Sequence, residues 1–258
     1  MTLAKKLLWG LAVVLVAFVA FAAWAFAPIV AGNRPLVDGQ SFAGGVTLVQ
    51  DGYVASYLLP ISEGQVALID CGNDEKGANL LAALSRLKLG PEAVRAVFLT
   101  HGHADHTAGC HLFPNADIYA FEADVASAEG TGRSKGPLPS LMDTPVEKRV
   151  KVTQRLKDGD AVQVGDVSVL PFLVPGHTAG SAAFLVNGVL YVGDSATAKP
   201  DGSVRPAPWV FSDNTAQNRA SLGLLYTRLR TRKVAVTQVA FSHSGPVDGM
   251  AGLEHVTE

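Results

Sequence analysis

The chain has 258 residues, of which 48% are hydrophobic and 17% are charged, and its formal net charge is −2. This composition excludes a disordered chain, and the length suits one large folded domain. Without a block of basic residues, the sequence also lacks the clustered positive face that nucleic-acid binding requires, so we expect no nucleic-acid partner.

The N-terminal segment, residues 1–27, is predicted to be a signal anchor that forms a single transmembrane helix. After Lys5 and Lys6, the chain is apolar and uncharged over residues 7–27, which at about 1.5 Å per residue can cross a hydrocarbon core of about 30 Å. The two lysines would stay in the cytoplasm, so the rest of the chain would face the periplasmic side of the membrane. The alternative is a cleaved signal peptide, which would leave a secreted or periplasmic protein.

The remainder of the chain is predicted to be a linker followed by a single domain. Residues 28–45 are rich in glycine, proline and polar residues, as linkers are, and residues 46–258 carry the periodic patterns. Alternating and helical spacing predicts the following elements: strands at 46–50, 53–60 and 65–70, a helix at 76–89, strands at 94–100 and 118–120, a helix at 121–128, strands at 161–164, 167–174, 181–186 and 189–192, a helix at 214–230, and a strand at 234–241. Strands followed by a helix occur twice, which predicts helix–sheet–sheet–helix layers.

A dense group of histidine and aspartate residues follows the strand at 94–100. Residues i and i+2 do not share a helix face, so His101 and His103 suit an extended loop and can point at one metal. Asp105 and His106 would begin a helix and can point at a second metal. Imidazole and carboxylate ligands suit Zn²⁺, and also Fe or Mn.

Three further candidate ligands each follow a later predicted strand: His177, Asp194 and His243. Five of the seven histidines therefore lie at strand ends, and His111 and His255 are the two left over. Because these strand ends can meet at one edge of the sheets, the sequence predicts a metal site there.

This pattern resembles the metallo-β-lactamase superfamily, over the chain from about Val46 to the C-terminus. The residues that carry the resemblance are the motif His101-x-His103-x-Asp105-His106 and then His177, Asp194 and His243, with Asp70 as an acid at the end of an early strand. The resemblance implies an α/β (α+β layered) fold, the αββα metallo-β-lactamase sandwich, preceded here by the transmembrane helix, with the site at one edge.

The resemblance also implies a role for each of these residues, with two Zn²⁺ ions as cofactors. His101, His103 and His177 would hold the first metal; Asp105, His106 and His243 the second; Asp194 would bridge both; and Asp70 would orient a ligand histidine through a hydrogen bond. A cap or turn former at the end of its strand is the alternative role for Asp70.

The expected activity is that of a metal-dependent hydrolase acting on a small ester, thioester, lactone or amide. Metal-bound water has a pKa near 7 in favourable sites, and Asp105 is the expected catalytic residue that moves its proton to the leaving group. Asp194 resembles the acid of glyoxalase II and of lactonases, whereas one major β-lactamase subclass has cysteine there and another has no bridging acid. The alternatives are a mononuclear iron oxidoreductase similar to persulfide dioxygenases, a β-lactamase, and a noncatalytic binding protein.

Two long loops, Gly130–Thr144 and Ala198–Asp213, are expected to select the small-molecule substrate. The alternative is that both loops are packed surface excursions and that Trp209 and Phe211 are core residues.

The chain has two cysteines, Cys71 and Cys110, which lack the spacing of a metal-binding pair. We expect two small buried thiols. A disulfide between them is the alternative if the domain lies outside the cytoplasm.

Overall fold

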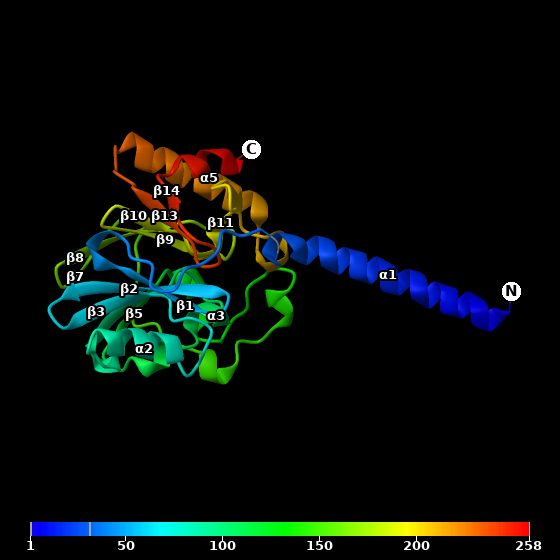
Figure 1. The fold of residues 1–258 in the computed structure, drawn as a ribbon, viewed down its shortest axis with the longest axis horizontal. Helices are drawn as coiled ribbons and strands as arrows, with labels where there is room; N and C mark the ends of the chain where they lie inside the picture. The colour runs from blue at the N-terminus through cyan, green and yellow to red at the C-terminus, as the bar shows by residue number, and fades with distance from the viewer. Residues whose placement is uncertain (1, 31, 258) are drawn as a thin grey trace.

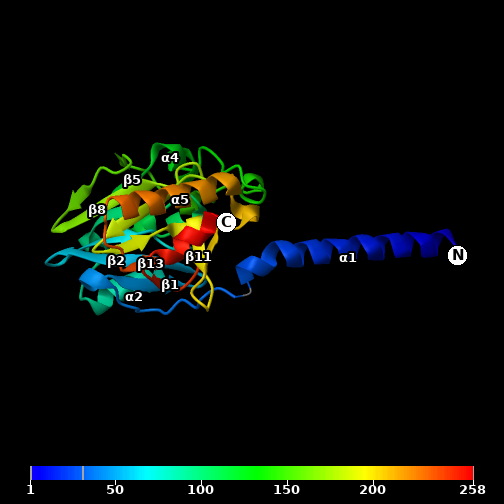
Figure 2. The same ribbon diagram turned by 90° about the horizontal axis from the view of Figure 1, so that it is seen from above.

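The computed structural model of the protein describes residues 2–30 and 32–257, and its strands form two facing six-stranded sheets and a two-stranded ribbon (Figure 1). Helices cover the outer faces of the two sheets, as Figure 2 shows from above. This is the predicted layered α/β fold. Met1, Ala31 and Glu258, which the predicted segment boundaries include, lie outside the described residues.

The first sheet has the order β1-β2-β3-β4-β5-β6. Its strands are β1 (Thr47–Asp51), β2 (Val54–Ser62), β3 (Gln65–Ile69), β4 (Val94–Phe98), β5 (Asp117–Ala120) and β6 (Gln154–Arg155). The first three strands pair antiparallel, and the pairs from β3 to β6 are parallel. Gly52 and Gly64 have positive φ in the two hairpin turns that join the first three strands, a conformation that glycine adopts at no steric cost.

The second sheet has the order β14-β13-β10-β9-β8-β7. Its strands are β7 (Val162–Val164), β8 (Val167–Leu173), β9 (Ala182–Val186), β10 (Val189–Tyr191), β13 (Gln238–Ala240) and β14 (Val247–Asp248), and the separate ribbon pairs β11 (Ala196–Ala198) with β12 (Val204–Pro206). The last predicted strand is therefore shorter than expected, since residues 234–237 are outside β13. The sequence predicted none of β6, β11, β12 and β14, which have two or three residues each.

Alternation along the strands divides the apolar side chains between the layers. In β3, Ala67 and Ile69 join the core between the two sheets, whereas Val66 and Leu68 join the core under the first helical layer. Successive side chains of a strand point to opposite faces, so a strand that is apolar throughout is buried on both. Residues of the second sheet and the last helix form a third core, which completes the four layers.

The helices that cover the sheets lie where the sequence predicted them. They are α2 (Ala78–Arg86) and α4 (Glu122–Ala128) beside the first sheet, α3 (Ala104–Thr107) after β4, and α5 (Thr215–Thr231) over the second sheet. Leu222, Leu225 and Leu229 of α5 are buried, and the side chain of Asn214 accepts a hydrogen bond from the Gln217 N–H (2.9 Å) and so caps the helix.

The N-terminal segment forms α1 (Leu3–Val30), which projects from the domain in both ribbon views (Figures 1 and 2). Large apolar side chains along it, such as Trp9 and Phe18, are exposed. No helix within the described residues combines sufficient length and apolarity to cross a membrane, so the predicted transmembrane helix is not supported.

Part of the segment predicted as a linker lies against the domain. The Arg34 N–H donates to the Ala198 carbonyl, and the Gly245 N–H donates to the Arg34 carbonyl, both at 2.8 Å. Phe42 is 7% exposed and packs edge-on against Tyr57 in the core between the sheets. Contacts therefore hold this stretch against the domain at Arg34 and at Phe42.

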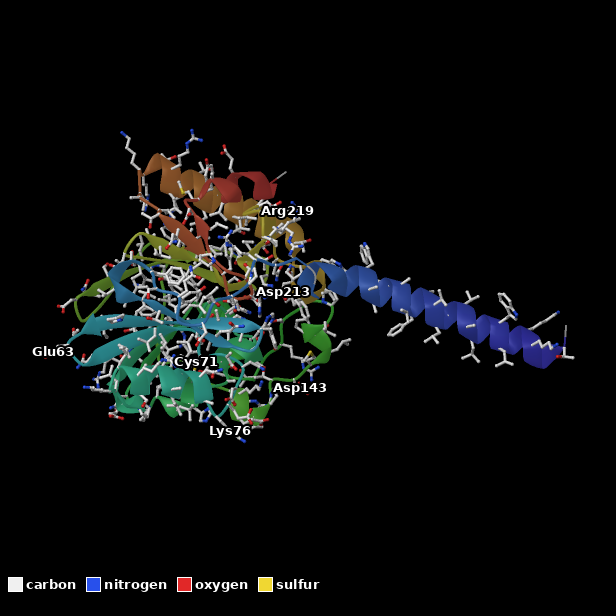
Figure 3. The ribbon with its side chains drawn as sticks, viewed as in Figure 1. Glu63, Cys71, Lys76, Asp143, Asp213 and Arg219 are labelled. Carbon is white, nitrogen blue, oxygen red and sulfur yellow. A yellow bond between two sulfur atoms is a disulfide. The ribbon has the colours of Figure 1, made fainter. Side chains whose placement is uncertain are left out.

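Cys71 and Cys110 form a disulfide, so the expectation of two free thiols was wrong. Cys71 directly follows β3, as labelled in Figure 3, and Cys110 follows α3. The turn after β3 packs against α3, where the Cys71 N–H donates to the His106 carbonyl (2.8 Å), and this brings the two Cα atoms to 5.2 Å. That separation is typical of a disulfide.

Candidate metal centre

The seven predicted ligands converge at one edge of the two sheets. His101 and His103 follow β4, Asp105 and His106 lie on α3, His177 follows β8, Asp194 lies in a short 3-10 turn, Gly193–Ser195, after β10, and His243 follows β13. The structure therefore brings together residues that are up to 142 positions apart (243 − 101). Their ligand atoms form three overlapping groups that could each hold a metal ion.

One group, which we call the three-histidine half, consists of His101, His103 and His177. The His101 Nε2 and His103 Nδ1 atoms are 3.0 Å apart, and the His177 Nε2 atom lies 3.2 Å and 3.1 Å from them. A neutral imidazole has one lone-pair nitrogen, and three such nitrogens facing one point suit a single cation. This arrangement is the protein part of a tetrahedral zinc site.

The other group, the carboxylate half, consists of Asp105, His106 and His243. The Asp105 Oδ1 atom lies 3.7 Å from His106 Nε2, and the Asp105 Oδ2 atom lies 3.6 Å from His243 Nε2. His103 is the N-cap of α3, whereas Asp105 and His106 lie on the helix itself. This change from loop to helix, which the sequence predicted, explains why the motif contributes ligands to both halves.

Asp194 lies between the two halves. Its Oδ2 atom is 3.0 Å from His243 Nε2, 3.6 Å from His177 Nε2 and 3.9 Å from His101 Nε2. Its Oδ1 atom and His106 Nε2 are buried and have no hydrogen-bond partner among the described residues. Such unpaired buried polar atoms are costly, and bound metal ions would satisfy them, so the residues present fit a metal centre.

Each ligand histidine is oriented through the ring nitrogen that faces away from the centre. The oxygen partners are Thr100 Oγ1 for His101, Ser134 Oγ for His103, Asp70 Oδ2 for His106, Ser212 Oγ for His177 and the Tyr53 carbonyl for His243, at 2.8 to 3.2 Å. A hydrogen bond of this kind fixes the tautomer and leaves the other nitrogen free to bind a metal.

Asp70 contacts His106 as the resemblance implies. Its carboxylate also accepts hydrogen bonds from the N–H and the hydroxyl of Thr100, at 2.8 and 2.7 Å. Because the Thr100 hydroxyl donates its hydrogen to Asp70, the same oxygen must accept a hydrogen bond from His101 Nδ1. Asp70 therefore orients His106 directly and His101 through Thr100.

The electrostatics of the three-histidine half keep its imidazoles neutral. Burial lowers the pKa of His101 well below its ordinary value, and it also lowers the pKa of His103. Burial lowers the pKa of His177 to about 3. Since the neutral ring is the form that binds metal, this half is ready for a cation at neutral pH.

In the carboxylate half the neighbouring acids reverse this effect. Burial lowers the pKa of His243, but the charge of Asp194 and its hydrogen bond outweigh burial and raise it to about 9. The pKa of His106 is raised for the same reason, since Asp194, Asp105 and Asp70 together outweigh its desolvation. Burial raises the pKa of Asp194, whereas His243 and His106 lower it, and the net effect is a strong lowering.

Both serines that orient ligand histidines come from the loops expected to select the substrate. Ser134 lies in the first loop and Ser212 in the second, and the Asp213 carboxylate accepts hydrogen bonds from the Lys135 and Gly136 N–H groups at 2.5 and 2.9 Å. The loops are therefore joined beside the three-histidine half. Sequence reasoning missed both serines, although their place in these loops was the available signal.

Trp209 is not a core residue, which corrects one of the alternatives for this loop. It is 37% exposed, and its ring packs against those of Phe21 and Trp24 on α1, with centroids 6.3 and 5.6 Å apart. The next residue, Val210, is buried instead.

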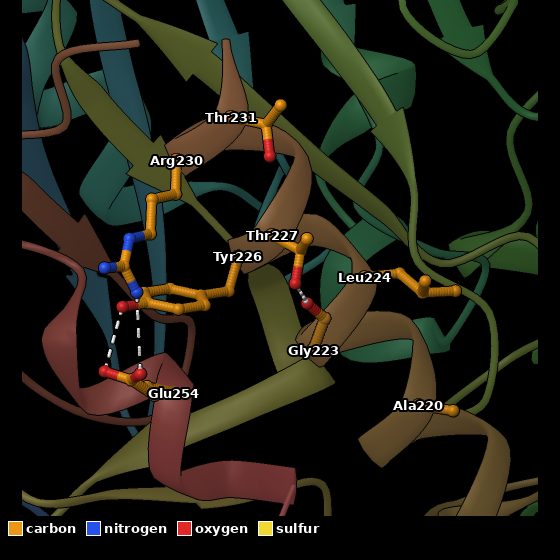
Figure 4. A pocket seen from close by; sticks show the side chains of 8 residues that line it. All are labelled: Ala220, Gly223, Leu224, Tyr226, Thr227, Arg230, Thr231 and Glu254. Carbon is orange, nitrogen blue, oxygen red and sulfur yellow. Dashed lines mark hydrogen bonds and ion pairs between the residues drawn. The ribbon is translucent and has the colours of Figure 1, made fainter. Parts of the chain in front are cut away.

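A shallow surface groove lies on α5, away from the metal centre (Figure 4). Its polar side chains pair with one another: the Tyr226 hydroxyl donates to Glu254 (2.9 Å), and Arg230 lies 3.8 Å from the same carboxylate. It contains none of the predicted ligands, so the chemistry of the chain is concentrated at the sheet edge.

Known proteins of similar sequence include hydroxyacylglutathione hydrolases. Those of Salmonella paratyphi A and Salmonella gallinarum are 28% identical over 151 residues, which cover 57% of this chain and 47% of theirs. The chain thus spans about half the length of the curated relatives it matches.

Solved structures of similar fold include a metallo-beta-lactamase family protein from Thermus thermophilus, with 23% identity and a TM-score of 0.60 over 83% of this chain and 78% of that one. A subclass B3 metallo-beta-lactamase of Bradyrhizobium japonicum has 17% identity and a TM-score of 0.62 over 87% and 90%. At these identities the likeness concerns the fold. The family model of the metallo-beta-lactamase superfamily matches residues 49–238, and so, as the ligand pattern predicted, this chain belongs to the metallo-beta-lactamase superfamily.

Proposed function

We propose that the protein is a hydrolase that uses two metal ions to cleave a small ester, thioester, lactone or amide. The observation that carries the proposal is the position of Asp194, whose Oδ2 atom lies within 3.9 Å of ligand nitrogens from both halves. A carboxylate placed in this way can bridge two ions, which hydrolytic two-metal sites hold about 3.5–4 Å apart.

The donor set indicates the metals that the centre would take. Five imidazole nitrogens and two carboxylates suit Zn²⁺, and Fe or Mn is the alternative. The three-histidine half would hold one ion, the carboxylate half the other, and Asp194 would bind both. When bound, such ions lower the pKa of water and polarise a carbonyl group.

Asp105 is the residue that we propose moves the proton. Its side chain is 23% exposed, compared with 11% for Asp194, so it reaches the solvent-facing side of the centre. Its carboxylate lies 3.6 Å from His243. From there it can take a proton during attack on the substrate and give it to the leaving group.

The relatives suggest which bond to test first. Their name, hydroxyacylglutathione hydrolase, describes a thioester substrate. The joined loops that carry Ser134 and Ser212 lie beside the three-histidine half and would line the substrate side. We therefore place thioesters first among the substrate classes, followed by lactones and simple esters.

The test combines metal analysis of the purified chain with hydrolysis of a panel of acyl-glutathione thioesters, lactones, aryl esters and β-lactams. We expect about two zinc ions per chain and turnover of at least one thioester, lactone or ester. Asp105→Asn should abolish most of that turnover. His111→Ala is the matched control, because His111 is exposed and its ring contacts the Ala108 carbonyl.

Other outcomes of the same experiment would replace this proposal. One iron per chain, with oxygen consumption in the presence of a persulfide, would assign the centre to an oxidoreductase. Hydrolysis of β-lactams alone would make the protein a β-lactamase. Turnover that Asp105→Asn leaves unchanged would favour a noncatalytic role for the centre.

We further propose that the domain acts outside the cytoplasm. The Cys71–Cys110 disulfide supports this location, since disulfides persist in oxidising compartments such as the periplasm and are rare in the cytosol. Cell fractionation with thiol alkylation tests it. We expect the chain in the envelope or periplasmic fraction with both cysteines protected from alkylation, and a cytosolic chain with two alkylated thiols would contradict the proposal.

A further inference from the structure

A buried carboxylate outside the ligand set lies directly behind the three-histidine half. Asp124, in the first turn of α4, is 3% exposed. Its Oδ2 atom accepts hydrogen bonds from the Gly102 N–H (2.9 Å) and the Thr178 hydroxyl (2.7 Å), and its Oδ1 atom accepts from the Gly180 N–H (2.7 Å). Both oxygens are thus occupied by donors from other segments.

Those donors belong to the two loops that carry the histidines. Gly102 separates His101 from His103, and Thr178 directly follows His177, with Gly180 two residues later. One carboxylate therefore joins the loop after β4, in the first sheet, to the loop after β8, in the second.

The backbone of α4 approaches both loops closely enough to require glycine. A Cβ atom on Gly102 would lie 2.7 Å from the Ala128 nitrogen, and one on Gly180 would lie 2.8 Å from the Asp124 Cβ. Any other residue at these positions would push α4 away and break the hydrogen bonds to Asp124.

A second set of contacts ties the same loops together. The Ser181 hydroxyl oxygen accepts from the Thr178 N–H (2.9 Å), and the Ala182 N–H donates to the Thr100 carbonyl (2.7 Å), next to His101. Ser181 thus holds the backbone of Thr178 while the Thr178 hydroxyl donates to Asp124, and the Ala182 bond ties this loop to the residue before His101.

The role of a helix cap does not account for Asp124. An acid in the first turn commonly stabilises its own helix through the exposed N–H groups. The three hydrogen bonds that the structure gives this carboxylate all come from the histidine loops. A carboxylate is the side chain that accepts on both oxygens and donates on neither, which is what three converging donors require.

We propose that Asp124 is a positioning residue for the first metal: it fixes the spacing between His177 and the His101–His103 pair and touches none of the three rings. The inference rests on the proposed metal centre. It predicts that loss of the carboxylate weakens metal binding at the three-histidine half and leaves the carboxylate half unchanged.

The test measures Zn²⁺ binding to the metal-free full chain by competition with a chromophoric chelator, in two backgrounds. Asp105→Ala with His243→Ala leaves the three-histidine half, and His103→Ala with His177→Ala leaves the carboxylate half. Asp124→Asn, which keeps the size but turns one acceptor into a donor, is added to each.

We expect Asp124→Asn to weaken Zn²⁺ binding by about 10–100-fold in the three-histidine background, the range that outer partners of metal ligands contribute. In the carboxylate background the affinity should stay within about twofold. Glu122→Gln is the matched control: it removes a charge from the same turn of α4, where the side chain is 79% exposed, and should change neither value. The visible spectrum of bound Co²⁺ should change with Asp124→Asn in the three-histidine background, because the ligand geometry changes.

Two results would overturn the inference. An equal loss in both backgrounds would mean that Asp124 supports the fold in general, and an unchanged affinity in the three-histidine background would mean that it positions nothing. If that background binds no Zn²⁺ even with Asp124 intact, the proposed metal centre itself fails, which is a different result.

A second variant carries the test if Asp124→Asn does not fold. Thr178→Val removes one donor to Asp124 and keeps the shape of the side chain. We expect about a threefold to tenfold loss of Zn²⁺ affinity in the three-histidine background, because the two hydrogen bonds from Gly102 and Gly180 to Asp124 remain. No loss there would contradict the inference.

Discussion

The two halves of the centre differ in charge. Burial dominates in the three-histidine half and keeps its rings neutral, with the pKa of His177 lowered to about 3. In the carboxylate half the acids dominate, and the pKa of His243 is raised to about 9. Without metal, the first half has lone pairs that face one another at 3.0–3.2 Å, whereas the histidines of the second half lie 3.0–3.7 Å from carboxylate oxygens. The three-histidine half can therefore bind a cation directly, whereas the carboxylate half must release protons first.

The two halves also differ in what holds them. Hydroxyl groups of Ser134 and Ser212 orient two rings of the three-histidine half. The carboxylate half relies on Asp70, on a backbone carbonyl and on the nearby Cys71–Cys110 disulfide. Hydrogen bonds between neutral groups are weaker than the charged bond from Asp70, so we expect the halves to respond to different perturbations.

The largest effect should come from the residue that joins the halves. Asp194→Asn keeps the shape but removes the charge shared by both metals, so we expect metal content to fall and hydrolysis to drop by about 10²–10³-fold, as for loss of a strong electrostatic group. Metal analysis and initial rates measure this. Asp160→Asn, an exposed acid, is the control, and a variant that keeps two metals and full activity would contradict the bridging role.

Removal of the disulfide should affect the carboxylate half more than the three-histidine half. Cys71 follows Asp70, and the bond closes a loop over 39 positions, so Cys71→Ala with Cys110→Ala should lower the free energy of unfolding by about 2–4 kcal/mol. Zinc affinity should fall in the carboxylate half, because the disulfide anchors Cys71 next to Asp70, and Asp70 is the hydrogen-bond partner of His106. Urea unfolding and zinc titration measure the two effects, and an equal loss in the three-histidine half would argue against separate supports.

The pH dependence of zinc binding should also distinguish the halves. Below about pH 9 the His243 ring is protonated in the metal-free protein, and the pKa of His106 is also raised. Zinc must therefore displace protons from both rings, so the affinity of the carboxylate half should rise by about tenfold or more per pH unit between about pH 7 and 9. His177 is already neutral there, so the three-histidine half should show a flat profile. Zinc titrations of the two half-site backgrounds at several pH values test this, and parallel profiles would contradict it.

The smallest effect should come from a single orienting serine. Ser134→Ala removes the partner of His103 Nε2, a neutral hydrogen bond worth about 1 kcal/mol, or about fivefold in zinc affinity at the three-histidine half. Ser140→Ala in the same loop, where the hydroxyl donates to the Pro137 carbonyl, is the control. A larger loss of zinc affinity in the carboxylate half than in the three-histidine half would contradict this role of Ser134.

The sequence predicted the parts of the fold and of the site that depend on local pattern. Helical spacing located α5. The motif from His101 to His106 divides between the three-histidine half and the carboxylate half, as the periods of loop and helix require. Parts that depend on distant contacts were not predictable.

Asp124 illustrates why the remainder escaped prediction. In the sequence it is one acid in a short helix, where a solvated side chain is the ordinary expectation. Its burial depends on Gly102 and Gly180, which lie in other loops. The disulfide is a similar case, since two cysteines far apart in sequence reveal no pairing until the turn after β3 packs on α3. The segment β11–β12 was too short to show a pattern.

The ligands of the centre come from both sheets, and this has a consequence for how the chain reaches its final state. The motif from His101 to His106 belongs to the first sheet, and His177, Asp194 and His243 belong to the second. Neither sheet alone supplies all the ligands of either half, so the proposed metal ions would find a complete site only after the two sheets have docked. Ions that bind the folded chain alone then stabilise it by mass action, and the zinc supply of its compartment would set how much of the chain survives proteolysis.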